Sequence, residues 1–468
     1  MTSNVLELIP QSEIETWKAG EHVLVVAGTG KCKTTWVKQV LWPYCKTKGL
    51  SLYTLANRVM LRDDIQHGTE MPVITYQLAE HRKEHPVWNA DVVVLDECHC
   101  LASDIQLDPM RNKMLRLFEN GRTIIIGLTA TPVKCVSRLF DSKRVYMVPR
   151  EYPHVESIST YYGADNTKKI MHAEAENGRV LCFMRSAQRG KEIKLHLPSS
   201  AFICSKNAPQ WDPEVEKLKE SITRQRRWGH DQVLITTKVM DNGVSIEDPQ
   251  VTAVIVETDD YAVDLIQMIG RIRCLEGQRI RLYIRLFPHE HFEQQRVSIQ
   301  RLLNEADKYL ANLEDTRYGR NAIVLGDGTL NGMAVSYLRQ RISDIDDILL
   351  VGVEEVISAQ LCHLPVQRWQ GSTANSTDEG AKPLANCAAE DIKDIITGAE
   401  GRRFYDRKKL TELFEDFTRE VLDKPQCSPY RRNINRAFEL SGLPYKIIRK
   451  QAGSGFERGK YYFTLVKN

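Results

Sequence analysis

Two successive series of short apolar segments constrain the fold of this chain most strongly. Helical or polar stretches separate the segments, and the second series starts after Tyr152. Strands that are apolar along their whole length are typical of parallel sheets that helices cover on both faces. The sequence therefore predicts an α/β protein with two tandem parallel-sheet domains. The predicted strands are residues 22–28, 50–56, 72–76, 91–97 and 122–130, then 179–184, 201–205, 232–237, 251–258 and 280–287.

The chain length and the changes of texture along it predict five segments. A chain of 468 residues exceeds what one hydrophobic core usually serves. We expect the first sheet domain at 1–150, the second at 151–290 and a helical extension at 291–367. A polar, small-residue-rich stretch predicts a flexible linker at 368–391, and a basic α+β module follows at 392–468.

The composition excludes several classes of protein. No run of eighteen apolar residues occurs, and the first residues form neither a basic leader nor a long apolar stretch. We therefore expect a cytoplasmic protein without membrane association. Eleven cysteines without a CxxC pair argue against a disulfide framework and against a zinc site. Cys98, His99 and Cys100 lie on one short segment and cannot close a tetrahedral metal site alone.

A glycine-containing loop follows the first predicted strand and opens a helix. Its sequence AGTGKCKTT, residues 27–35, is close to the phosphate-binding pattern GxxxxGKT. Small residues let backbone N–H groups approach phosphate oxygens, and the helix adds its positive N-terminus. Lys33 would reach the β and γ phosphates, and the Thr34 hydroxyl would bind magnesium. The other residues expected to line the nucleotide are Gly28, Thr29, Gly30, Lys31, Cys32 and Thr35.

The loop departs from the pattern at two positions. Ala27 replaces the first glycine, and Cys32 stands where the pattern has its second. A side chain at Cys32 would crowd the phosphates if that position needs a positive φ. Two alternatives stay open: a glycine-containing turn that binds no nucleotide, and a shifted register in which Lys31 is the phosphate lysine. We prefer Lys33, because the shifted register puts Cys32 in the place of the hydroxyl.

An adjacent pair of acids ends the fourth predicted strand. In VVVLDECH, Asp96 and Glu97 lie at the carboxyl end of the strand, where open α/β sheets bind their ligands. Asp96 would hold magnesium, and Glu97 would orient and deprotonate the attacking water. The alternative is an acid pair that faces solvent.

Three further segments complete an ordered set of motifs. They are GLTATP at 127–132, TTKVMDNGVSI at 236–246 and QMIGRIR at 267–273. Together with the loop and DECH, they resemble superfamily-2 helicases with a DExH box, over about residues 20 to 290. The texture is similar to bacterial, phage or mobile-element helicases, with viral polyprotein helicases as second choice. The resemblance implies two RecA-like domains that hydrolyse ATP with Mg²⁺ at the cleft between them.

The resemblance also implies roles for single residues. Gln267 would face the γ phosphate, and Arg271 would act as an arginine finger. Arg273 substitutes for the family's second arginine, because that place holds Cys274. Thr129 and Thr131 would link the ATP state to domain closure, and Asp241 and Gly243 would touch the nucleotide from the second domain. Gln11 is either an adenine contact or an ordinary surface residue.

A nucleic-acid strand is the partner that the family implies. By resemblance, hydroxyls and arginines on both domains would contact its phosphates without reading sequence. The residues are Arg58, Thr75, Tyr76, Arg185, Ser186, Thr236 and Thr237. We expect single-stranded or tailed duplex DNA rather than RNA, translocation as the output, and replication or recombination proteins as further partners.

The C-terminal module carries a local excess of positive charge. From residue 401 onward there are sixteen Lys and Arg against eight Asp and Glu, although the whole chain has a net charge of only +3. Two helical stretches, a basic turn and an aromatic terminal strand resemble a winged-helix module. Arg431, Arg432, Arg436 and Lys446 are its candidate nucleic-acid contacts. The alternative is a basic docking module or a solvated helical cap.

Two rival functions remain at this point. A degenerate phosphate loop would leave a nucleic-acid-binding protein with weakened turnover. A protein-remodelling ATPase would bind no nucleic acid even at low salt, where phosphate contacts are strongest.

Overall fold

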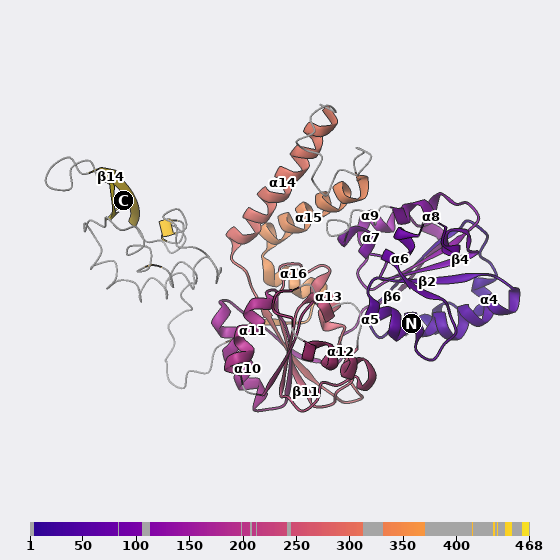
Figure 1. Ribbon diagram of the computed structural model, residues 1–468, viewed down its shortest axis with the longest axis horizontal. Helices are drawn as coiled ribbons and strands as arrows, with labels where there is room; N and C mark the ends of the chain where they lie inside the picture. The colour runs from indigo at the N-terminus through magenta and orange to yellow at the C-terminus, as the bar shows by residue number, and fades with distance from the viewer. Residues whose placement is uncertain are drawn as a thin grey trace. The chain divides into compact units, whose positions relative to one another are not determined.

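The computed structural model describes most of the first 369 residues and part of the C-terminal region. The described ranges are 4–82, 84–104, 113–197, 199–205, 208–211, 213–240, 245–311 and 331–369, with positions 414, 434, 435, 438, 445–451 and 461–467. Two compact units are present (Figure 1): Met1–Thr160 with Met171–Arg368, and Tyr161–Ile170 with Trp369–Asn468.

The first sheet has six strands in the order β3-β2-β4-β5-β1-β6, and each neighbouring pair is parallel. Five of the strands were predicted. The sixth, β6, lies at the sheet edge and leaves Val145 and Met147 exposed, so it lacks the continuous apolar run of a buried strand. The strands are β1 (His22–Ala27), β2 (Leu52–Ala56), β3 (Val73–Thr75), β4 (Val92–Asp96), β5 (Ile124–Thr129) and β6 (Val145–Val148).

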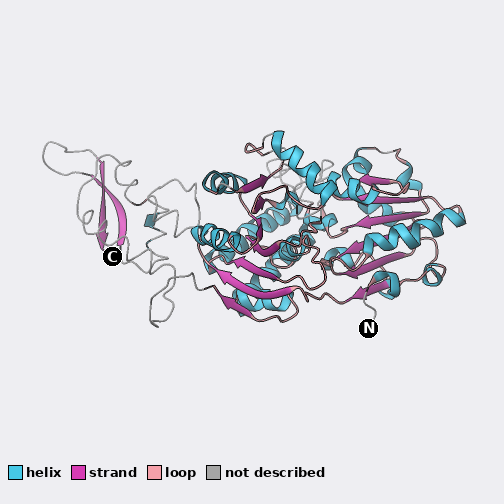
Figure 2. Ribbon diagram, turned by 90° about the horizontal axis from the view of Figure 1, so that it is seen from below, coloured by secondary structure: helices cyan, strands magenta, loops and turns pink. Residues whose placement is uncertain are grey.

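Both faces of this sheet are buried, as its apolar strands require. Along β4, Val93 and Leu95 join one hydrophobic cluster, while Val92 and Val94 join another on the opposite face. Helices cover the two faces (Figure 2). They are α1 (Val5–Leu8), α2 (Gln11–Ile14), α3 (Lys33–Trp36), α4 (Trp42–Lys48), α5 (Val59–Gln66), α6 (Tyr76–His81), α7 (Cys100–Ser103), α8 (Arg116–Glu119) and α9 (Lys134–Ser137).

The helix after the glycine loop is interrupted by a π-helical turn. The turn, Val37–Leu41, joins α3 to α4, which has Pro43 in its first turn. Proline lacks an N–H donor and crowds the preceding turn, so a wider turn just before it accommodates the ring. The helix ends at Gly49, whose φ of 67° only glycine adopts without strain.

The second sheet has seven strands in the order β13-β7-β12-β11-β8-β10-β9. Its strands β7 and β13 were not predicted. The first three residues of β7 are half-buried or exposed, and β13 has only three residues. The strands are β7 (Val155–Tyr161), β8 (Arg179–Phe183), β9 (Ser200–Ile203), β10 (Val233–Thr236), β11 (Val251–Val256), β12 (Ile280–Arg285) and β13 (Val366–Arg368). The helices are α10 (Ala164–Ala175), α11 (Ala187–His196), α12 (Pro213–Gln225) and α13 (Asp264–Ile269).

The strand β13 changes the predicted outline of the second domain. It follows the helical extension and pairs in parallel with β7, residue 366 opposite 158. The second sheet therefore takes a strand from beyond the predicted boundary at 290.

The helical extension consists of α14 (His289–Ala311), α15 (Gly332–Val351) and α16 (Val353–Gln360). Its apolar side chains pack into the core of the first sheet domain. Leu303 and Ala306 of α14 and Tyr337 and Leu338 of α15 belong to the same cluster as Leu95 of β4. The extension thus covers one face of the first domain, although it follows the second domain in the chain.

In the C-terminal unit, the described residues include an antiparallel hairpin of β14 (Tyr445–Gln451) and β15 (Tyr461–Lys467). Lys446, one of the candidate nucleic-acid contacts, lies in β14. The rings of Phe414 and Phe438 meet edge to face at 5.2 Å and are fully buried. The linker beyond residue 369 and the arginines 431, 432 and 436 lie outside the described residues. Within the described part of the chain, no helix has the length and hydropathy needed to cross a bilayer.

Candidate active site

The carboxyl ends of β1, β4 and β5 place three predicted motifs at one edge of the first sheet. Because these neighbouring strands are parallel, the loops that follow them emerge side by side. The phosphate loop follows β1, Asp96 and Glu97 end β4, and Thr129 ends β5.

The phosphate loop contains a cysteine in a backbone conformation that favours glycine. Cys32 has φ 61° and ψ 26°, in the left-handed region, and it caps α3. Gly30, two residues earlier, has φ 79°. A side chain at a left-handed position costs about 1 kcal/mol, and Cys32 bears this cost. The cysteine that replaces the second glycine of the pattern therefore occupies a backbone conformation that favours glycine.

The two lysines of the loop point to different surroundings. The Lys33 ammonium is buried and donates to the carbonyl oxygens of Ala27 at 2.7 Å and Gly28 at 3.1 Å. Burial lowers the pKa of Lys33, while the charges of Glu97 and Asp96 act in the opposite direction. Lys31 instead pairs with the exposed carboxylate of Glu151 at 2.7 Å. This geometry favours the register in which Lys33 is the phosphate lysine.

Asp96 and Glu97 are buried side by side, and their pKa values move in opposite directions. Burial raises the pKa of Asp96 to about 7, and the neighbouring charge of Glu97 adds to the rise. Burial alone would also raise the pKa of Glu97, but the charges of His99, Lys33 and Arg271 lower it. Glu97 adopts φ 50°, a strained backbone conformation for a glutamate. The lowered pKa of Glu97 suits a carboxylate that accepts a proton. The raised pKa of Asp96 suits a carboxyl that a metal ion neutralises.

Residues of the second domain reach the Glu97 carboxylate. The side-chain amide of Gln267 on α13 donates to Glu97 Oε2 at 3.3 Å and to Thr131 Oγ1 at 3.2 Å. Arg271 donates to Gln267 Oε1 at 2.9 Å, and its guanidinium lies 3.7 Å from Glu97 Oε1. All of these side chains are buried. The predicted residues of both domains thus converge on one point.

The sequence interpretation considered His99 only as part of a weak metal pattern, but in the structure it joins the network around Glu97. His99 Nδ1 lies 3.2 Å from Thr129 Oγ1 and 3.5 Å from Glu97 Oε2. The Thr129 hydroxyl also accepts from the backbone N–H of Thr131 at 3.0 Å. His99 therefore connects the acid pair to the segment after β5. The fourth letter of DECH was the signal available for it.

The phosphate loop also contacts the second domain. A β-carbon on Gly270 would lie 2.2 Å from Thr29 Cγ2, which no real contact allows. A β-carbon on Gly30 would lie 3.5 Å from the Arg273 guanidinium. Burial, together with the charge of Arg271, lowers the pKa of Arg273 to about 10. Arg273, which the resemblance named as a substitute for the family's second arginine, is thus a cation beside the loop.

The remaining predicted nucleotide residues lie in other surroundings or outside the described part of the chain. Thr34 and Thr35 lie within α3 and are partly exposed. Gln11 is exposed and donates to Glu15 at 3.4 Å. Asp241 and Gly243 lie outside the described residues.

All three predicted nucleic-acid contacts on the first domain have partners within the protein. The Thr75 hydroxyl caps α6 by accepting from Leu78 N at 3.2 Å. Tyr76 is fully buried and donates to the Asp96 carbonyl oxygen at 3.0 Å. This corrects the expectation for Tyr76, whose side chain supports the acid strand and offers no surface to a phosphate. Arg58 is partly exposed and pairs with Asp104 at 3.3 Å.

The predicted contacts on the second domain also differ from one another. Thr236 is fully buried, and its hydroxyl donates to the carbonyl of partly exposed Thr237 at 3.2 Å, so its side chain is likewise not at the surface. Ser186 is exposed and caps α11 by accepting from Arg189 N at 3.3 Å. Arg185 is exposed over about half of its side chain and pairs with Asp259.

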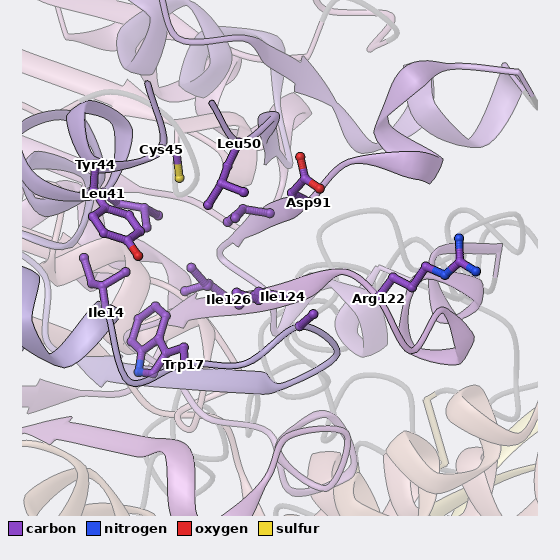
Figure 3. Close-up of a pocket in the computed structure, with 12 residues that line it drawn as sticks. Ile14, Trp17, Leu41, Tyr44, Cys45, Leu50, Asp91, Arg122, Ile124 and Ile126 are labelled. Atoms are coloured by element: carbon purple, nitrogen blue, oxygen red, sulfur yellow. The ribbon is translucent and has the colours of Figure 1, made fainter. Parts of the chain in front are cut away.

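A separate cavity of about 230 Å³ lies on the first domain (Figure 3). Asp91, Val92 and Ile124, at the amino ends of β4 and β5, line it together with Trp17 and Tyr44. Its position at the opposite edge of the sheet separates it from the acid pair.

The residues present fit a magnesium-bound nucleoside triphosphate. Within the described part of the chain, no three His, Cys, Asp or Glu side chains gather into a metal site. Magnesium is usually held by one or two carboxylates together with substrate phosphates, so Asp96 and the Thr34 hydroxyl would suffice. Burial raises the pKa of the Asp96 carboxyl, although the charges of Lys33 and Arg271 act in the opposite direction. Lys33, Arg271 and Arg273 would balance phosphate charge.

Comparisons with known proteins return structural matches only. No family model and no curated protein matches the chain. The helicase Lhr of Mycobacterium smegmatis, bound to ssDNA and AMP-PNP, is 14% identical with a TM-score of 0.42, over 62% of this chain and 46% of that chain. Mss116p bound to ssRNA and AMP-PNP is 12% identical with a TM-score of 0.44, over 76% and 90%. The Escherichia coli DEAH/RHA helicase HrpB is 12% identical with a TM-score of 0.43, over 72% and 50%.

Helicases are thus also what the solved structures return, and the predicted fold class of two parallel-sheet α/β domains is present in this chain. The chain spans less than two thirds of the Lhr and HrpB chains.

Proposed function

We propose that this chain is an ATP-driven nucleic-acid motor of the superfamily-2 type, which hydrolyses ATP between its two sheet domains. The observation that carries the proposal is the contact of Gln267 and Arg271 with Glu97. Glu97 lies beside the phosphate loop, and two side chains of the other domain approach its carboxylate. This arrangement suits a reaction that domain closure switches on.

The proposed division of labour follows the surroundings of each side chain. Lys33 exchanges its two carbonyl acceptors for the β and γ phosphates, and Thr34 and Asp96 hold magnesium, which supplies charge neutralisation. Glu97 orients the attacking water and takes its proton, because its lowered pKa makes it the ionised member of the acid pair. Arg271, with Arg273 beside it, stabilises the charge that develops on the transferred phosphoryl group.

The first test compares ATP binding with turnover. Glu97→Gln should bind a fluorescent ATP analogue like the wild type and lose about a thousandfold in turnover, because it cannot accept a proton. Glu151→Gln, which removes an exposed carboxylate paired with Lys31, is the matched control and should retain activity. Normal turnover by Glu97→Gln would exclude Glu97 as the base.

The register of the loop is tested with its two lysines. Lys33→Ala should weaken nucleotide binding, whereas Lys31→Ala should not, because Lys31 pairs with Glu151 away from the acid pair. A loss confined to Lys31→Ala would show that the shifted register is correct.

A nucleic-acid-binding protein with weakened turnover is the second candidate function. The left-handed Cys32 favours it, because a side chain at this position would crowd a bound phosphate. ATPase measurements with and without single-stranded DNA or RNA separate the two: strand binding without stimulated turnover would support the second candidate. An ATPase that binds no strand even at low salt would indicate protein remodelling.

The motor would either unwind a duplex or move along a strand, and it would act on DNA in preference to RNA. Strand displacement on tailed DNA and RNA duplexes separates unwinding from translocation and tests the expected preference for DNA. Thr129 and Thr131, in the network around Glu97, would couple the ATP state to strand movement.

A further inference from the structure

Three polar side chains converge on a single oxygen atom of Asp259 in the second domain. The Arg185 guanidinium lies 2.9 Å from Asp259 Oδ2, and His291 Nε2 lies 2.8 Å from it. The side-chain amide of Gln295 donates to the same oxygen. Arg185 follows β8, whereas His291 and Gln295 are four residues apart on α14 and therefore share one helix face.

The ring of Phe287 packs against two members of this group, His291 and Arg185. Phe287 is buried, its ring stacks on His291 with centroids 4.8 Å apart, and the Arg185 guanidinium lies 5.4 Å from its centre. The side chain of Arg185 is 45% exposed, whereas that of Asp259 is only 13% exposed. The donors thus form a prearranged group that solvent, and hence a ligand, reaches from the Arg185 side.

Asp259 is held as an anion in this group. Burial by itself would raise the pKa of Asp259, but the His291 hydrogen bond and the charges of Arg185, His291 and Lys238 lower it below its ordinary value. The carboxylate therefore neutralises the guanidinium at neutral pH. A phosphate oxygen carries the same charge and accepts from the same donors as this carboxylate oxygen.

We propose that Arg185, His291 and Gln295 form a binding site for one phosphodiester group of a single-stranded nucleic acid, and that Asp259 occupies this site until a strand displaces it. The inference rests on the proposed function and adds α14 to the strand path. Asp259 is then an internal competitor that weakens binding of the strand. His291 and Gln295 contact the phosphate beside Arg185 once the carboxylate has moved away.

The sign of one substitution tests the proposal. Asp259→Asn keeps the side-chain shape but removes the competing charge, so it should bind fluorescent oligo(dT) or oligo(U) about fivefold more tightly at low salt. In the wild type Arg185 is already neutralised by Asp259, whereas in Asp259→Asn the strand must neutralise it. The slope of log affinity against log salt should therefore steepen by about 0.7.

The donors are tested in the same background. Adding His291→Ala or Gln295→Ala to Asp259→Asn should remove most of the gained affinity, because the phosphate loses a donor. Asp346→Asn is the matched control, since it breaks an ion pair with Arg296 of α14 and should leave strand affinity unchanged. Thermal melting of each variant checks folding. If Asp259→Asn fails to fold, His291→Ala alone should weaken binding about threefold.

The outcomes separate this inference from the proposed function. Weaker or unchanged strand binding by folded Asp259→Asn would overturn the inference, because Asp259 would then orient Arg185 and not compete with the strand. Failure of the wild type to bind any strand at low salt, with ATP binding intact, would instead overturn the proposed nucleic-acid function.

Discussion

Gly270 of the second domain packs directly on Thr29 of the phosphate loop. A β-carbon at position 270 would lie 2.2 Å from Thr29 Cγ2 and 2.5 Å from its hydroxyl oxygen. Arg271, the next residue, reaches Glu97 across the same contact. The close approach therefore fixes how near the arginine comes to the acid pair, and only glycine allows it.

Gly270→Ala should separate these two segments. The added methyl group pushes Thr29 away, which withdraws Arg271 from Glu97, and a misplacement of this kind lowers turnover about tenfold or more. The measurement is steady-state ATP hydrolysis alongside thermal melting.

A suppressor and a control sharpen the Gly270 test. Thr29→Gly removes the atoms that the methyl group meets and should restore part of the activity of Gly270→Ala. Gly121→Ala adds a methyl group where nothing lies within 4 Å and should be neutral. Full activity of Gly270→Ala would show that this contact does not form during turnover.

The continuous apolar runs predicted ten strands of the two sheets. They missed strands in which only part of the residues are buried. The edge strand β6 exposes Met147, and β7 begins with half-buried or exposed residues, so neither shows a long apolar run. The pairing of β13 with β7 joins residues about two hundred positions apart. No local pattern reports a pairing of that kind.

The candidate site was predictable to the extent that residue order reports which strand end a motif occupies. The apolar run placed Asp96 at a strand end, and the resemblance placed Gln267 opposite the γ phosphate. In the structure Gln267 donates to Glu97, the residue after Asp96. Side-chain direction was not predictable, because a residue at a strand end can turn inward or outward. Tyr76 and Thr236 turn inward, against expectation. His99 owes its contacts to the tertiary arrangement.

Replacing Cys32 with glycine should stabilise the chain. The left-handed backbone at position 32, with φ 61°, costs a cysteine about 1 kcal/mol that glycine does not incur. Urea unfolding of Cys32→Gly should therefore show a gain of about 1 kcal/mol, less the greater entropy of glycine in the unfolded chain. Cys32→Ala keeps the β-carbon and should show no gain. An equal gain in both variants would mean that the thiol, and not the backbone, is unfavourable.

Removing His99 should slow turnover without preventing ATP binding. His99 lies 3.5 Å from Glu97 and 3.2 Å from Thr129, so His99→Ala frees the acid to move and disconnects it from the segment after β5. We expect a loss of about tenfold in turnover, by analogy with other misplaced catalytic groups. ATP-analogue titration should be unchanged, since Lys33 is untouched. Weakened ATP binding equal to the loss of turnover would show that His99 supports the fold of the site.

The stability of the metal-free protein should fall with rising pH because of Asp96. Burial, reinforced by Glu97, raises the pKa of this carboxyl from 3.8 to about 7, so the folded chain holds a proton that the unfolded chain has released over that interval. Stability falls with pH wherever the folded state binds more protons, and the decline should therefore run from about pH 4 to about pH 7. Asp96→Asn cannot titrate, so its melting temperature should decline less over this range. Asp264 and Asp344, whose pKa values are also raised to about 6 by burial, are present in both proteins and cancel in the difference. Magnesium with an ATP analogue should abolish the difference in slope, because the cation favours the ionised carboxylate. Equal slopes in the metal-free wild type and Asp96→Asn would show that Asp96 is ionised at its ordinary pKa and that the acid pair is already compensated.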